Sequence, residues 1–266
     1  MKLGIGRRLI LPILFLLIVG WAVRAELDVD ELPTYIMHAG GTTVDGRTGT
    51  NSIEALDTSY ENGHYWIEVD FNWTSDDSLV CLHDWQSTYS YNLTGVLVPN
   101  LELFESLRIS TYGYESPTLD TLIKWMQEHP LAMIVTAVKE NNQRAVERIS
   151  KDYSQFIDRF IVQIYNQDEC SFVEACGFEN IIYTLYRVPM EQRYDIESLR
   201  NFVENSEKLD AITVAEDRDN SNRIASLVEL GIPIYVHTVN DPEAQAFWRD
   251  LGVHGFYCDY VQECFK

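Results

Sequence analysis

Trp66-Ile67-Glu68-Val69-Asp70-Phe71 is the part of the sequence that indicates most about how this chain folds. Side chains alternate across a β-strand, so Glu68 and Asp70 share one face and the apolar residues between and after them share the other. The apolar face suits packing against helices. The acidic face then points into the interior of a closed sheet, where two neighbouring carboxylates lose hydration and need a compensating cation.

The rest of the chain repeats short β-rich runs and helical patterns in alternation. Strands are expected at residues 35–39, 65–71, 79–83, 133–138, 160–165, 181–186, 211–215, 234–239 and 255–258. Helices are expected at residues 52–62, 119–128, 143–157, 169–176, 196–207, 221–230 and 242–251. Strand–helix repetition in a mature chain of about 240 residues predicts a single-domain α/β fold, a (β/α)8 TIM barrel, rather than an open doubly wound sheet.

The N-terminus has the pattern of an export signal. Basic residues between Lys2 and Arg8 precede an apolar run over residues 9–23, and Ala25 provides a small residue for cleavage. This pattern predicts a signal peptide over residues 1–25 and a secreted or extracytoplasmic barrel over residues 26–266. An uncleaved membrane tether is the alternative.

The charge of the chain excludes some partners. It carries 41 Asp and Glu against 20 Lys and Arg, a formal net charge of −21, and loss of the signal would make it more acidic. Such a surface repels nucleic acid, and it leaves no membrane contact except through an uncleaved N-terminal segment. A small or polymeric anionic substrate then requires a local positive centre.

Cysteine usage suits an oxidising compartment. Cys170 and Cys176 have the same spacing as Cys258 and Cys264, and a local disulfide within each pair is one interpretation. Cys81 lies in an apolar run and is expected to be a buried free thiol.

Residues 85–117 form a long aromatic-rich connection before the next expected helix. A connection of this length in a compact domain is typical of a lid or a binding insertion, and we assign it that role.

Two kinds of cation could balance the charges of Glu68 and Asp70. A hard divalent cation, Mg2+ or Ca2+, binds carboxylate oxygens well. An ion pair with an inward-facing basic residue is the other interpretation, and Lys139 is the obvious candidate. The residues alone leave both open.

Two histidines favour chemistry at this place. His38 ends the first expected strand and His83 ends the run from Leu79, each at the face where barrel enzymes build their active sites. One strand-end histidine is more often structural. Two of them beside a carboxylate pair indicate acid–base catalysis, because histidine exchanges protons near neutral pH.

These residues resemble a known family. His38-Ala39-Gly40-Gly41, Asn51-Ser52-Ile53-Glu54-Ala55, Glu68-Val69-Asp70, the turn at residues 74–77 and His83-Asp84 occur in the order of the glycerophosphodiester phosphodiesterases. Residues 235–240 and 255–259 resemble the last two strands of that family. The resemblance covers essentially the whole mature chain, and it implies a barrel of the phospholipase C type.

The resemblance also implies roles for residues. Glu68 and Asp70 would be metal ligands, and His38 and His83 would act as base and acid in hydrolysis of a glycerophosphodiester or related phosphodiester. Asp84 would hold the His83 loop or merely cap a turn.

The chain departs from the family pattern at three positions. Ala39 replaces an arginine, Thr50 replaces a glutamate, and Ala137 replaces the third metal carboxylate. Lys139 or Arg187 is the expected substitute for the lost phosphate-binding arginine.

Two inward polar residues, His237 and Gln163, are further candidates for substrate contact. Competing interpretations are a non-catalytic relative that binds phosphorylated glycans or lipids, and a phospholipase of the sphingomyelinase D kind. A glycoside hydrolase is disfavoured because its paired carboxylates should lie on different strand ends.

Overall fold

The alternation at residues 66–71 is realised in strand β2 (Trp66–Trp73) of the computed structural model, which describes residues 32–86, 98–107 and 113–260. Ile67, Val69 and Phe71 are fully buried against the helices that surround the strands. Trp66 belongs to a separate apolar cluster inside the ring of strands, and Glu68 and Asp70 follow it on the same face. The predicted division of the strand into an apolar and an acidic face is therefore confirmed.

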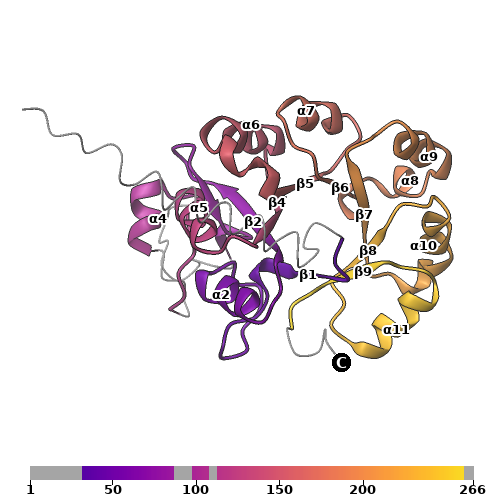
Figure 1. Ribbon diagram of the computed structural model, residues 1–266, viewed down its shortest axis with the longest axis horizontal. Helices are drawn as coiled ribbons and strands as arrows, with labels where there is room; N and C mark the ends of the chain where they lie inside the picture. Colours follow the sequence, from indigo (N-terminus) through magenta and orange to yellow (C-terminus); the bar gives the residue numbers. More distant parts are fainter. Residues whose placement is uncertain (1–31, 87–97, 108–112, 261–266) are drawn as a thin grey trace, which may run out of the picture.

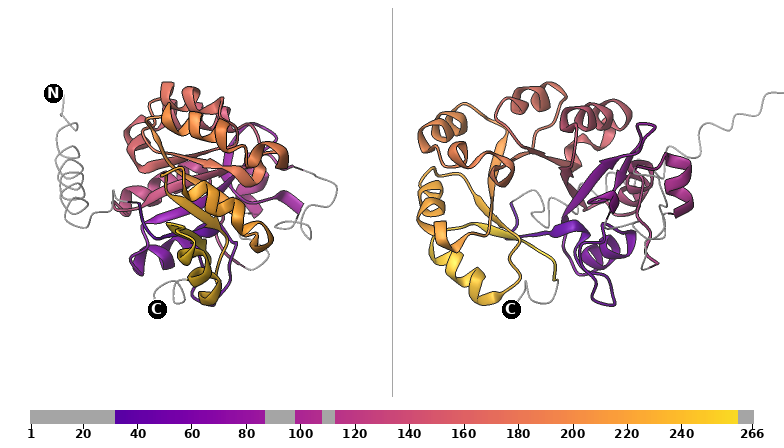
Figure 2. Two further views of the ribbon diagram at one scale, coloured as in Figure 1. Left: turned by 90° about the vertical axis from the view of Figure 1, so that its right-hand side faces the viewer. Right: turned by 180° about the vertical axis from the view of Figure 1, so that it is seen from behind.

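Parallel strands close into a barrel around this interior (Figure 1). The barrel strands are β1 (Tyr35–Met37), β2, β4 (Met133–Val138), β5 (Phe160–Ile164), β6 (Ile181–Thr184), β7 (Leu209–Ala215), β8 (Ile234–His237) and β9 (Gly255–Cys258). Each pairs in parallel with the next, and β1 pairs with both β9 and β2. The first and last strands consequently lie side by side, as the view from behind shows (Figure 2). The structure confirms the predicted (β/α)8 barrel.

Helices encircle the strands and alternate with them along the chain (Figure 1). They are α2 (Ile53–Glu61), α4 (Leu101–Leu107), α5 (Leu119–Glu128), α6 (Asn142–Asp152), α7 (Glu169–Ala175), α8 (Met190–Arg193), α9 (Ile196–Glu204), α10 (Ser221–Val228) and α11 (Pro242–Asp250). Four of them begin at a side chain that accepts a hydrogen bond from the first turn, which places their starts at Ser52, Thr118, Asp195 and Asp241.

The barrel interior has an apolar layer and a polar layer. Side chains from all eight strands fill the apolar layer: Ile36, Trp66, Met133, Val135, Ile161, Ile182, Ala211, Tyr235 and Tyr257. Two residues further along five of these strands the inward position is polar: Glu68, Gln163, Thr184, Thr213 and His237. Because all strands run the same way, these polar residues meet at the carboxyl-terminal end of the barrel, where barrel enzymes place their sites.

One predicted barrel strand lies outside the barrel. Residues 79–83 contribute β3 (Leu79–Cys81), which pairs antiparallel with the end of β2. The tight turn at residues 74–78 joins the two strands as a hairpin, so no helix separates them. The expectation that His83 ends a barrel strand is wrong.

The connection at residues 85–117 is only partly described. Helix α4, which we did not predict, occupies its middle, and Trp85 packs edge-on against Phe104 of that helix at 5.9 Å between ring centroids. Residues 87–97 and 108–112 lie outside the described residues, so the lid assignment stays a prediction. The predicted signal peptide, residues 1–25, also lies outside them. None of the described helices combines the length and apolar composition needed to cross a membrane.

The cysteines are only partly as expected. Cys81 is a buried free thiol, as predicted, but Cys170 and Cys176 are also free. Their predicted bridge is wrong. Cys170 lies on the buried side of α7, and Cys176, six residues later at the end of the helix, lies on a different face because a helix has 3.6 residues per turn. Cys258 is disulfide-bonded, and its predicted partner Cys264 lies outside the described residues.

We expect Phe71→Ala to lower the free energy of unfolding by about 3 to 5 kcal/mol, because the fully buried ring leaves a cavity between β2 and the helices. Urea unfolding followed by circular dichroism measures the change. Phe247→Ala is the matched control, since Phe247 is 37% exposed and its loss should cost much less. Equal losses in the two variants would contradict the assigned core.

Candidate active site

The acidic pair lies toward the carboxyl-terminal end of the barrel, with Glu68 in the polar layer and Asp70 two residues further along β2. Glu68 and Asp70 are each 1% exposed, so neither carboxylate reaches solvent. Burial of this kind disfavours the charged form unless cations and hydrogen-bond donors compensate it. The contacts of each carboxylate therefore show how the site is built.

Asp70 is fully compensated by two neighbours. The Lys139 ammonium forms an ion pair with Oδ1, and the Asn51 amide donates to Oδ2 at 2.8 Å. Asn51 also accepts a hydrogen bond from the backbone N–H of Asp70 at 2.8 Å. Burial alone would raise the pKa of Asp70, but Lys139, Asn51 and the nearby His83 outweigh burial and hold it below its ordinary value.

Glu68 is less well compensated. Its Oε2 accepts a hydrogen bond from the backbone N–H of Ala39 at 2.6 Å. Ala39 adopts the left-handed conformation (φ 49°), which is costly for a residue with a Cβ and is typical of functional sites. Burial and the charge of Asp70 raise the pKa of Glu68 above its ordinary value.

His38 is held by an acid from the other end of the chain. Its Nδ1 lies 2.6 Å from Oδ1 of Asp259, and Asn240 donates to Oδ2 of the same carboxylate at 2.6 Å. This contact exists because β1 pairs with β9. Burial lowers the pKa of His38, but the hydrogen bond to Asp259 and the charges of Glu68, Asp259 and Asp70 together raise it to about 9. His38 is therefore a cation at neutral pH.

The raised pKa of His38 also links protonation to stability. A histidine whose folded pKa exceeds its unfolded value stabilises the fold below the unfolded pKa, here 6.5, and loses that contribution as the pH rises through about 9.

His237 supports His38 as a neutral neighbour. The two rings meet edge to face with centroids 4.7 Å apart, and Tyr257 packs on His237 at 4.8 Å. Burial and the positive charge of His38 lower the pKa of His237 to about 3, so it stays uncharged.

His83 enters the site from outside the barrel. It follows β3, its side chain is 59% exposed, and its Nδ1 lies 3.1 Å from Oδ2 of Asp84. The residue before it, Leu82, donates its backbone N–H to the carbonyl of Asp70 at 2.9 Å, which holds the His83 segment beside the acidic end of β2. The structure thus brings both predicted catalytic histidines to the two carboxylates, His38 from the barrel and His83 from the β2–β3 hairpin.

The residues present do not fit a divalent-metal site of three carboxylates. Asp70 pairs in register with Ala137 on β4. Ala137 shares the inward face of β4 with Met133 and Val135, and its side chain is only a methyl group. Lys139 occupies one oxygen of Asp70. Within the described ranges, no three His, Cys, Asp or Glu side chains gather closely enough to hold a metal ion. Ligation by Glu68 and Asp70 stays a prediction.

Two of the predicted substrate-contact residues, Gln163 and Arg187, differ in how many of their hydrogen-bonding groups are already in use. Gln163 is fully buried; its Oε1 accepts from Thr184 at 2.5 Å, while its Nε2 has no hydrogen-bond partner among the described residues. Arg187 donates to the carbonyls of Val138 at 2.7 Å and Lys139 at 2.8 Å, so two of its nitrogens already brace the end of β4.

Sequence reasoning missed three residues of the site. Asn51 and Asp259 both lay inside the motifs of the family resemblance, which was the available signal. Tyr165 gave no signal; its ring packs under the Arg187 guanidinium at 3.8 Å, and its buried hydroxyl lacks a partner within the described part of the chain.

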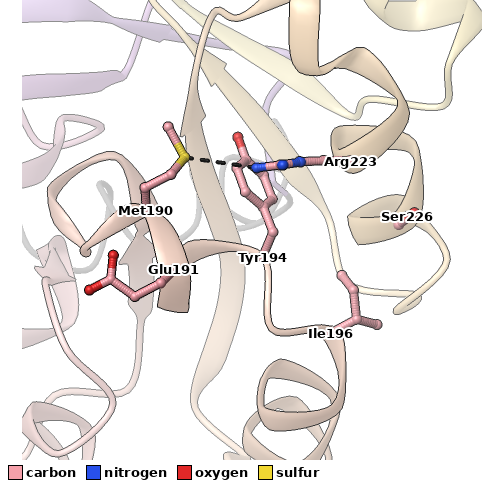
Figure 3. Close-up of a pocket in the computed structure, with 6 residues that line it drawn as sticks. All are labelled: Met190, Glu191, Tyr194, Ile196, Arg223 and Ser226. Atoms are coloured by element: carbon pink, nitrogen blue, oxygen red, sulfur yellow. Dashed lines mark hydrogen bonds between the residues drawn. The ribbon is translucent and has the colours of Figure 1, made fainter.

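A surface pocket of about 590 Å3 lies elsewhere, between α8, the start of α9 and α10 (Figure 3). Arg223 contacts Met190 there and stacks over Tyr194. No histidine and none of the predicted site residues lines it.

Comparisons with known proteins identify the fold and the family of this chain. The Bacillus subtilis protein YhdW, provisionally named a glycerophosphodiester phosphodiesterase, is 22% identical over 85% of this chain and 93% of its own. The glycerophosphodiester phosphodiesterase of Thermotoga maritima matches with a TM-score of 0.63 at 21% identity, covering 87% of this chain and 96% of that one. A phosphodiesterase of Oleispira antarctica, solved with the product sn-glycerol-3-phosphate, matches with a TM-score of 0.64 at 17% identity, covering 88% and 95%. These likenesses establish the shared fold.

The family comparison goes further than the fold. Residues 40–263 match the glycerophosphoryl diester phosphodiesterase family. The match begins after β1 and His38 and ends beyond the last barrel strand, so it covers the barrel from β2 to β9 and includes Glu68, Asp70, His83 and Asp259. The chain therefore belongs to the glycerophosphoryl diester phosphodiesterase family, whose members are phosphoric diester hydrolases.

Proposed function

We propose that this chain hydrolyses a glycerophosphodiester or a related phosphodiester by proton transfer through His38 and His83. The observation that carries the proposal is the convergence of a His38–Asp259 pair, a second histidine and a buried acidic pair at the mouth of the barrel. Family membership supports the reaction class. The product held by the Oleispira antarctica phosphodiesterase supports a glycerol phosphate moiety in the substrate.

The site offers positive charge to a phosphate although the chain is strongly acidic overall. His38 is cationic at neutral pH, and Lys139 lies at the mouth with 27% of its side chain exposed. Arg187 adds a third positive group beside Lys139. Lys139, Arg187, Gln163 and His237 are the residues that we assign to substrate contact, in agreement with the sequence-based interpretation.

The proton roles follow from the electrostatics. His38 holds a proton in the free site, so we assign it as the acid that protonates the departing alkoxide. His83 takes a proton from the attacking water as the water oxygen bonds to phosphorus and the bond from phosphorus to the leaving oxygen breaks. This order reverses our expectation from the sequence, because Asp259 was not recognised there as the partner of His38.

Enzymes of this family generally depend on a divalent metal. In this chain the predicted ligands, Glu68 and Asp70, lack a third carboxylate because Ala137 stands opposite Asp70. None of the steps above passes through a metal ion.

We also propose that the enzyme acts outside the cytoplasm, which the basic and apolar pattern of residues 1–25 supports. Expression with the native N-terminus should release a mature protein that begins at Glu26, measured by intact mass. Retention of residues 1–25 on a membrane-bound product would replace secretion with a tether.

The reaction is tested on a panel of glycerophosphodiesters and on bis-p-nitrophenyl phosphate, with release of alcohol or phosphomonoester measured. Turnover of the panel is the expected result. Binding of glycerol phosphate by folded protein without turnover would favour the non-catalytic alternative. Headgroup release from sphingomyelin or lysophospholipid alone would favour the sphingomyelinase D kind.

We expect His38→Ala and His83→Ala each to lower kcat by about 100- to 10,000-fold, since each removes one proton transfer from the transition state. Initial rates at saturating substrate measure the loss. His254→Ala is the control, because His254 contacts the Leu32 carbonyl at the opposite end of the barrel. Full activity in either site variant would remove that histidine from the mechanism.

We expect Asp259→Asn to lower the pKa of His38 from about 9 toward its ordinary value, because the variant removes the negative charge at Nδ1. Proton NMR titration of the histidine ring signals measures the shift. The exposed Asp250→Asn is the control for a lost surface charge. An unchanged titration of His38 in Asp259→Asn would show that Asp259 does not hold its proton.

A further inference from the structure

At the position of the missing carboxylate the chain has only the methyl group of Ala137, and the nearby Lys139 side chain forms an ion pair with Asp70. Ala137 faces Asp70 in the register of β4 and β2, and it is 2% exposed. Two residues further along the chain, Lys139 places its ammonium on Oδ1 of Asp70. A positive charge thus already lies at the acidic pair, supplied by the chain itself.

The remaining oxygens of the acidic pair are largely in use. Asn51 donates to Oδ2 of Asp70 at 2.8 Å, and the Ala39 N–H donates to Oε2 of Glu68 at 2.6 Å. A divalent ion at this place would have to displace Lys139 or bind beside its charge. Both the donor set and the local charge therefore weaken a metal site.

Lys139 retains the capacity to bind an anion. An ammonium has three donors, and the ion pair with Asp70 uses one of them. The backbone at Lys139 is held in place, because Arg187 donates to its carbonyl at 2.8 Å and to that of Val138 at 2.7 Å. Arg187 is itself fixed by stacking on Tyr165. The ammonium is therefore positioned at the mouth of the barrel by a rigid support.

We infer that the Lys139 ammonium, which is ion-paired with Asp70, binds the phosphoryl group of the substrate at the place where other family members use a divalent metal. This chain then needs no metal for hydrolysis. The inference rests on the proposed function, because it concerns the same site. It also assigns Ala137 as the substitution that separates this chain from a metal-binding site.

The first experiment compares turnover of glycerophosphocholine after EDTA treatment with turnover in added Mg2+ or Ca2+. We expect equal rates, within about twofold. Loss of turnover in EDTA that Mg2+ or Ca2+ restores would overturn the inference and leave the proposed function intact. Absence of turnover under every condition would overturn the proposed function, and the binding experiments below would then decide the inference.

The second experiment measures binding of sn-glycerol-3-phosphate in EDTA by calorimetry. Wild-type protein should bind, and Lys139→Met should bind about tenfold more weakly or worse, because a charge-assisted contact is lost. Lys139→Arg should retain part of the affinity. Lys124→Met, on the exposed face of α5, controls for the loss of one positive charge. Binding by wild type only in the presence of metal, or equal binding by Lys139→Met, would overturn the inference.

The third experiment rebuilds the absent ligand. In calorimetry without substrate, wild-type protein should bind Mg2+ and Ca2+ no more tightly than millimolar. Ala137→Asp combined with Lys139→Met should bind at least tenfold more tightly, because three carboxylates then converge without the competing ammonium. Thermal unfolding with and without Mg2+ confirms that the double variant folds. If it does not fold, the same metal titration is made on the single variant Lys139→Met, which removes the competing ammonium alone. Tight metal binding by wild type would overturn the inference.

Discussion

Two carboxylates buried beside each other at the end of β2 are the constraint on which the active site depends. Their charge cannot be left unbalanced inside a barrel, because burial penalises the ionised form and the two groups repel each other. The chain meets this constraint from three directions. Lys139 arrives from the end of β4, Asn51 from the loop before α2, and the Ala39 N–H from the turn after β1. Closing the barrel is what brings these three together.

The constraint also explains the state of the histidines. The carboxylates stabilise a proton on His38, and Asp259 adds a direct hydrogen bond to the same ring. His237, packed on His38, receives the opposite effect and remains neutral. Two neighbouring imidazoles of the same chemistry are thus driven to different protonation states by their surroundings. That separation is what an acid needs if it is to hold its proton until the leaving group departs.

Much of the architecture could be predicted from local patterns. The starts of α5 and α11 follow from Thr118 and from Asp241-Pro242, whose capping chemistry is written in a few adjacent residues. The inward direction of Glu68 and Asp70 follows from strand alternation. The antiparallel pairing of β3 was missed, since a short apolar run gives no sign of the strand beside which it will lie. Helix α4 was missed because its seven residues are too few to show a clear helical period within the aromatic-rich connection.

Local patterns of residues are enough to predict the barrel, the acidic pair and both histidines, because periodicity and short motifs involve residues close together in the chain. Which groups those residues contact depends on how distant parts of the chain come together in the folded barrel. The partnership of His38 with Asp259 joins residues 221 positions apart, and the pairing of Asp70 with Lys139 places an ammonium opposite Ala137. Such contacts depend on closure of the ring of strands and on register between neighbouring strands, which no local pattern specifies.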